Sequence, residues 1–210
     1  MAITTYAQLQ AAAANWLVRA DLTARIPEFI SLAEARLNRL LRTRLAEAEV
    51  AVSATVGSRK AALPPGFTEP LRLWIEREEG RLELPFLEAA LIGASSLRGT
   101  PGAWTVDGAT IAFDRPCADA YALTLRMLKA FALSDGAPTN ALLTDAPDVY
   151  LFATLCEAGP FLRDGELAAA YEAKLDRAIG ELNAKEARSR APQRLSTELS
   201  ALSTPRGLAC

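Results

Sequence analysis

The sequence has 210 residues, half of them hydrophobic and 23% charged, with a formal net charge of −2. This composition is typical of a globular protein with its own core and excludes a wholly disordered chain. There is no histidine, which removes the commonest general base, the commonest metal ligand and the usual partner of a nucleophilic Ser or Cys. The three cysteines, Cys117, Cys156 and Cys210, form no CxxC pair. We therefore expect no metal, no cofactor and no enzymatic activity.

The N-terminal segment does not have the pattern of a signal peptide. It begins MAITTYAQLQ, without a basic region followed by a continuous apolar core. No apolar stretch approaches the ~20 residues needed to cross a bilayer, and widely spaced cysteines fit a reducing cytoplasm. We expect a protein that is made in the cytoplasm, is soluble and does not bind membranes.

Two helices are predicted near the N-terminus, over 5–19 and 25–43. In the first, Thr4 or Thr5 can act as the cap, and apolar residues recur at helical spacing. These are Tyr6, Leu9, Ala13, Trp16 and Leu17. Pro27 is suited to the first turn of the second helix. The apolar stripe of that helix comprises Ile26, Phe29, Ile30, Ala33, Leu37, Leu40 and Leu41.

Four arginines gather toward the end of the second helix, namely Arg36, Arg39, Arg42 and Arg44. Positive charge near a helix C-terminus is favoured by the helix dipole, so a solvated face explains them. A face for an acidic partner or for a neighbouring subunit is the alternative interpretation.

From residue 47 the periodicity changes from helical to alternating, which predicts a β-rich region over about 46–131. Val50, Val52, Ala54 and Val56 share one side of the first strand. Further strands are expected over 71–75, 81–84 and 121–127, and a short helix over 85–96. Residues 104–113 are typical of a hairpin with an Asp-Gly turn. The pattern leaves open whether these strands form a small sandwich or a single curved sheet.

The last third of the chain returns to helical periodicity, over 147–163 and 165–189. Gly159-Pro160 is expected to kink or end the first of these helices. The N- and C-terminal apolar stripes need one another to be buried. We therefore predict an α+β fold that is mainly α, in which residues 1–190 form a single domain. Its N- and C-terminal helices would form a bundle carrying the β-rich insertion.

Residues 191–210 contain too few apolar groups to fold alone and are predicted to form an extended C-terminal tail. Its candidate docking residues are Arg194, Leu195, Leu199, Leu202, Arg206 and Leu208. The segment is either an unstructured end or one that becomes ordered on a partner, at a sheet edge or in a groove.

No catalytic constellation is found. Gly93 and Gly99 do not have the spacing of a phosphate-binding loop. Cys156 lies on an apolar helical face, and Trp16, Trp74 and Trp104 lie on apolar stripes, so all four are predicted to pack in a core. A carboxylate-based hydrolase is a remote alternative.

Three segments share motifs with one protein family. Residues 4–42 contain NWL followed by IPEFISLAEARLNRLLR, residues 99–116 read GTPGAWTVDGATIAFDRP, and residues 140–166 read NALLTDAPDVYLFATLCEAGPFLRDGE. In these blocks and in their order, the sequence resembles bacteriophage head–tail adaptor proteins. The blocks together cover most of 4–190, and none of them is a catalytic signature.

The resemblance implies a structural virion protein at the head–tail interface. Such adaptors form a ring, usually of twelve subunits, beneath the portal, where they continue the DNA channel and provide a platform for the tail. Their partners would be the portal protein and a downstream tail, nozzle or stopper protein, and the C-terminal segment commonly clasps the portal. Genomic DNA would pass without sequence-specific binding, which a slightly negative protein suits. A DNA-binding packaging factor such as a small terminase subunit, using Arg36, Arg39, Arg42 and Arg44, is the alternative.

Overall fold

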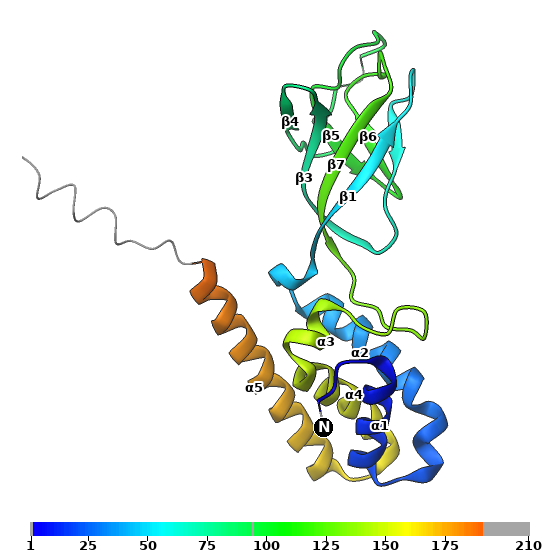
Figure 1. Ribbon diagram of the computed structural model, residues 1–210, viewed down its shortest axis with the longest axis vertical. Coiled ribbons are helices and arrows are strands. Elements are labelled where there is room, and N and C mark those ends of the chain that lie inside the picture. The colour runs from blue at the N-terminus through cyan, green and yellow to red at the C-terminus, as the bar shows by residue number, and fades with distance from the viewer. Residues whose placement is uncertain (1, 94, 191–210) are drawn as a thin grey trace, which may run out of the picture.

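Helices and antiparallel strands occupy separate lobes of the molecule, which confirms the α+β class (Figure 1). The computed structural model describes residues 2–93 and 95–190. The helical lobe contains α1 (Tyr6–Leu17), η1 (Ala20–Arg25), α2 (Ile26–Leu40), α3 (Ala141–Asp145), α4 (Pro147–Leu162) and α5 (Gly165–Arg190). The β lobe contains β1 (Glu47–Ala54), β2 (Lys60–Ala62), β3 (Phe67–Arg77), β4 (Gly80–Leu84), β5 (Trp104–Asp107), β6 (Thr110–Phe113) and β7 (Tyr121–Lys129). A short 3₁₀ helix, η2 (Arg44–Ala46), lies between the lobes.

The helical lobe is built around α4. Its buried residues face several sides of the helix, and α1, α2, α3 and α5 all pack against it. A helix that is apolar nearly all round is stable only when other helices cover it. The three longer neighbours each contribute an apolar stripe, so the four longest helices share one core.

The N-terminal helices have capping residues that the sequence indicates. Thr5 Oγ1 accepts the Gln8 backbone N–H at 3.3 Å, and Gln8 Oε1 accepts the Thr4 backbone N–H at 2.8 Å. The first bond satisfies a donor in the first turn of α1, and the second holds the residue before the cap. Pro27 lies in the first turn of α2, as predicted. This helix ends at Leu40 rather than at residue 43. Of the last predicted stripe residues, Leu40 is 54% exposed, whereas Leu41, just beyond the helix, is buried.

Pro160 lies inside the last turn of α4 and does not end the helix. The helix continues to Leu162 and stops where Arg163 adopts a left-handed conformation with φ 52°. Pro160 lacks the N–H that would donate to the Cys156 carbonyl, and only two residues of the helix follow it. The break between α4 and α5 therefore lies at 163–164.

The β lobe is a small sandwich, which settles the choice that the sequence left open. One sheet has the order β1-β7-β3-β4 and the other the order β2-β6-β5, with antiparallel pairing throughout. Their inner faces share one core, in which Trp104 is fully buried. The Trp104 indole N–H donates to the Leu84 carbonyl at 3.0 Å and so ties the two sheets together.

The hairpin β5–β6 forms as predicted, with its turn displaced by one residue. Asp107 pairs with Thr110, so the two central residues are Gly108 and Ala109. Of these, only Gly108 has a positive φ, 58°. Glycine at the first central position is typical of a type II′ turn, which matches the twist of the strands.

The helix predicted over 85–96 is wrong for the described residues of that segment. Phe86 forms a bridge to Trp104, and only residues 89–91 make a turn. The Leu87 N–H donates to the Trp104 carbonyl, and the Trp104 N–H donates to the Pro85 carbonyl. Pairing with the edge of β5 therefore overrides the local helical preference. The short elements β2 and α3 were not predicted.

The three tryptophans differ from the prediction that all pack in a core. Trp104 does, whereas Trp74 is half-buried with the Arg81 guanidinium over its ring. Trp16 is 45% exposed. It lies near the end of α1, where its ring packs edge-on against Phe152 and leaves one side in solvent.

Replacing Trp104 with Ala is expected to lower the free energy of unfolding by about 3–5 kcal/mol. The change opens a cavity between the sheets and leaves the Leu84 carbonyl without its indole donor. Urea unfolding followed by circular dichroism measures it. Leu97→Ala is the control, because Leu97 is 77% exposed. A change as small for Trp104→Ala as for the control would contradict a core centred on Trp104.

Candidate functional site

Side chains typical of a metal or nucleophilic centre do not come together in the described chain. Among residues 2–93 and 95–190, no group of three or more Cys, Asp or Glu could hold a metal ion. Cys117 and Cys156 are buried free thiols, and burial raises the pKa of Cys156 to about 12. Such a thiol is not a nucleophile near neutral pH. That the protein is not an enzyme stays a prediction.

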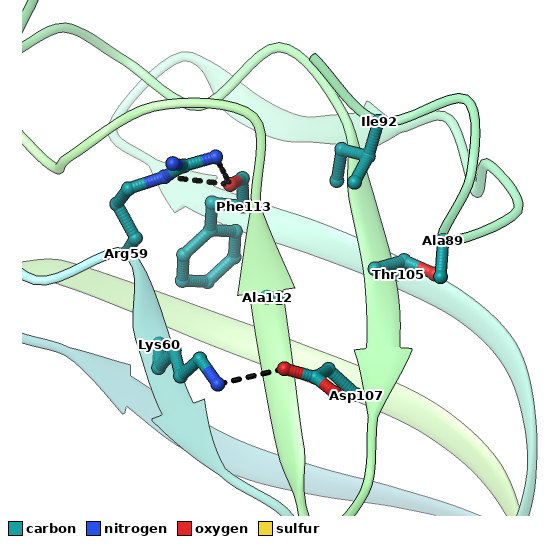
Figure 2. A pocket seen from close by; sticks show the side chains of 8 residues that line it. All are labelled: Arg59, Lys60, Ala89, Ile92, Thr105, Asp107, Ala112 and Phe113. Carbon is teal, nitrogen blue, oxygen red and sulfur yellow. Dashed lines mark hydrogen bonds and ion pairs between the residues drawn. The ribbon is translucent and has the colours of Figure 1, made fainter. Parts of the chain in front are cut away.

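A hollow of about 430 Å³ lies on the outer face of the sheet β2-β6-β5, beneath the segment around Ala89 and Ile92 (Figure 2). Its two cations are engaged within the chain. Arg59 Nη2 donates to the Phe113 carbonyl at 3.1 Å, and Lys60 Nζ lies 2.7 Å from Asp107 Oδ2. An anionic ligand would have to displace these contacts.

The four arginines at the end of α2 have separate surroundings. Arg36 binds carboxylates of α4 and α5, and Arg42 Nη2 lies 2.7 Å from Glu69 Oε1 on β3. The Arg44 backbone N–H donates to Glu186 Oε1 at 3.2 Å, and Arg39 is exposed. Two of these side chains thus form ion pairs within the chain. Their role toward an acidic partner or a neighbouring subunit stays a prediction.

Arg36 forms the most extensive of these contacts. Its Nη1 and Nη2 donate to the two oxygens of Glu172 at 2.9 and 2.6 Å, and Nη1 lies 3.7 Å from Glu157 Oε1. The guanidinium lowers the pKa of the Glu172 carboxyl through this bidentate hydrogen bond. One side chain thereby connects α2, α4 and α5.

A second polar group, which we call the polar seam, consists of Glu34, Asn38, Asn140 and Tyr150. Asn140 Nδ2 donates to the Tyr150 hydroxyl at 2.7 Å, and that hydroxyl donates to Glu34 Oε1 at 3.2 Å. Asn38 accepts the Phe131 N–H at 2.7 Å and donates to the Phe131 carbonyl at 3.0 Å. The seam therefore joins α2 and α4 to the segment that returns from the β lobe.

Burial raises the pKa of Glu34 to about 7, while hydrogen bonds from Tyr150 and from the Leu133 backbone N–H act in the opposite direction. Burial also raises the pKa of Tyr150. The sequence interpretation did not identify this seam. The spacing of Glu34 and Asn38 could have indicated it. They are four residues apart and lie beside the apolar stripe of α2, where polar side chains are partly buried.

The predicted docking residues of the tail, Arg194, Leu195, Leu199, Leu202, Arg206 and Leu208, lie outside the described residues. Their role stays a prediction.

Comparison with known families identifies the chain. The family model described as "SU10 adaptor protein" matches residues 4–197. The chain belongs to the SU10 adaptor protein family. This is a family of phage head–tail adaptors, so the resemblance seen in the sequence is confirmed. A search of curated proteins gave no match. The helices of the described residues are too short or too polar to cross a membrane.

Arg36→Met is expected to lower the free energy of unfolding by about 1–2 kcal/mol at pH 7. This is less than the loss of a fully buried ion pair would cost, because Arg36 and Glu172 are partly exposed. Glu172 has a lowered folded pKa, so its stabilisation is present above its ordinary pKa of 4.5 and is lost as the pH falls below that value. The difference between the proteins should therefore shrink in acid. Urea unfolding at pH 7 and pH 3.5 measures it.

The matched control is Arg177→Met, which breaks a pair with Glu181 at 3.2 Å whose arginine side chain is 83% exposed. It should change stability by less than about 0.5 kcal/mol. An equal loss in both variants would show that Arg36 is no more than a surface charge.

Proposed function

We propose that this protein is a structural head–tail adaptor that forms a ring beneath the portal, continues the DNA channel and presents a platform for the tail. The match of the adaptor family to residues 4–197 carries this proposal. Twelve subunits is the number we propose, with the portal protein above and a tail, nozzle or stopper protein below. The protein would act as a part of the virion.

The charge arrangement is compatible with DNA passing through such a ring. A channel that holds many unpaired cations would bind phosphates and retain DNA. Here Arg36 is neutralised by Glu172, Arg42 by Glu69 and Arg126 by Glu47. This pairing engages Arg36 and Arg42, two of the four arginines that a small terminase subunit would need for DNA, and so supports the adaptor.

The division into lobes also supports a connecting role. A helical lobe and a β lobe with separate cores lie at the two ends of one subunit, so each end offers a surface of its own (Figure 1). A protein that joins two different partners needs two such surfaces, and we propose that each lobe contacts a different neighbour in the virion.

Native mass spectrometry of the protein alone, and then mixed with the portal of the same phage, tests the ring. We expect a monomer alone and addition to the portal in portal-matched number, twelve for a twelve-subunit portal. This result would mean that the portal templates assembly. A protein that leaves the portal mass unchanged under all conditions would refute the adaptor role.

Deleting residues 191–210 is expected to leave the fold intact and to weaken portal binding, because both described cores are built from residues 9–182. Circular dichroism checks the fold, and native mass spectrometry measures bound copies per portal. A full-length variant with Leu195, Leu199, Leu202 and Leu208 changed to Ser separates the leucines from chain length. Undiminished binding by both variants would exclude the tail from portal docking.

A further inference from the structure

The two lobes are joined at a narrow waist that two chain segments cross. Residues 41–46 lead from α2 into β1, and residues 130–140, which we call the return strap, lead from β7 to α3 (Figure 1). Hollows flank the crossing. One of about 270 Å³ is bordered by Asn38 and Glu69, and another of about 320 Å³ by Leu45 and Asn140. These hollows leave unfilled space beside both segments, where the junction could change its shape.

The return strap is held on α2 by the polar seam. Asn38 pairs with both backbone groups of Phe131, and the Leu133 backbone N–H lies near enough to Glu34 to lower the pKa of its carboxyl. Apolar anchoring comes from Phe131 and Leu133, which are buried in the helical core, whereas residues 134–139 between them and Asn140 are exposed. Glu34 and Asn38, one turn apart on α2, thus determine where the return strap begins on the helical lobe.

Glu34 is an unusual residue for this position, because its contacts are with uncharged groups. The interactions found for it within the described chain come from the Tyr150 hydroxyl on α4 and the Leu133 N–H on the strap. Both are donors, and neither is a cation. A half-buried carboxylate with two neutral donors loses part of its hydration without a compensating positive charge. Opening the strap would rehydrate it.

We propose that the return strap is a pH-dependent latch: it is tightest on α2 when Glu34 is protonated and opens more often when Glu34 is ionised, which frees the β lobe to reorient about the waist. The hydrogen bonds of the polar seam hold the closed strap on α2, and the hollows beside it give space into which it can open. The latch is a property of the single subunit and does not depend on ring formation.

The direction follows from linkage. The pKa of Glu34 is about 7 when the strap is closed, and its ordinary value is 4.5. Between these values the closed form binds more protons than the opened form, so closure is favoured in acid and weakens as the pH rises. The opening constant should rise by up to about tenfold per pH unit between these values and should level off above them.

Hydrogen exchange of the full chain, measured by NMR between pH 4.5 and 8 and corrected for intrinsic rates, tests the latch. The amides of Phe131 and Leu133 should lose protection as the pH rises, while the amide of Leu155 in the centre of α4 should not. Glu34→Gln should abolish the pH dependence at both amides. Glu28→Gln, on the exposed side of the same helix, should leave it unchanged.

A second variant guards against a trivial loss of structure. Tyr150→Phe removes a donor that favours the ionised carboxylate, so the pH at which protection is lost should move upward rather than disappear. A flat profile in the unmodified protein, or the same profile in Glu34→Gln, would overturn the latch. So would an equal loss of protection at Leu155, since the pH would then act on the whole helical lobe.

Discussion

The helical lobe depends on one constraint, which is that α4 cannot be stable unless it is covered on several sides. Its buried side chains include Val149, Tyr150, Leu155 and Ala158, which do not fit one face of a helix. The apolar stripes of α1 and α2 come from the start of the chain, and that of α5 comes from its described end. The ends of the chain must therefore meet before the core can form, and the β lobe is left between them as a unit with its own core.

The two cores are linked through β7. This strand places Leu123 and Leu125 in the sandwich, while Leu128 and then Phe131 lie in the helical core. One segment thus contributes to both lobes across the waist. The ion pair between Arg42 and Glu69 spans the same junction on a second side, although both side chains are substantially exposed and contribute little. Burial of β7 residues, more than charge, therefore positions the lobes.

Much of this fold follows from periodicity. The stripes of α1, α2 and α5 and the alternation in β1 and β7 were legible because burial on one face repeats at a fixed spacing. The described residues of 85–96 did not follow their periodicity, because Phe86 and Leu87 pair with Trp104, a partner that helical spacing does not reveal. Leu40 was predicted to lie on the apolar stripe but is exposed, because α2 ends there, one turn after its last buried residue, Leu37. At Phe86 a tertiary contact decides what local preference cannot, and at Leu40 the end of the helix does.

The polar groups were less predictable than the cores. Arg36 is separated by 136 residues from Glu172, which neutralises it, and Glu34 by 116 from Tyr150. A cluster of like charges in the sequence therefore says little about charge at the surface, since Arg36 and Arg42 are paired by carboxylates that only folding brings near. The same reasoning applies to the adaptor role. If neighbouring subunits and the portal are recognised through this protein's surface, then the groups left available after internal pairing determine the contacts, and the arginine cluster as a whole does not.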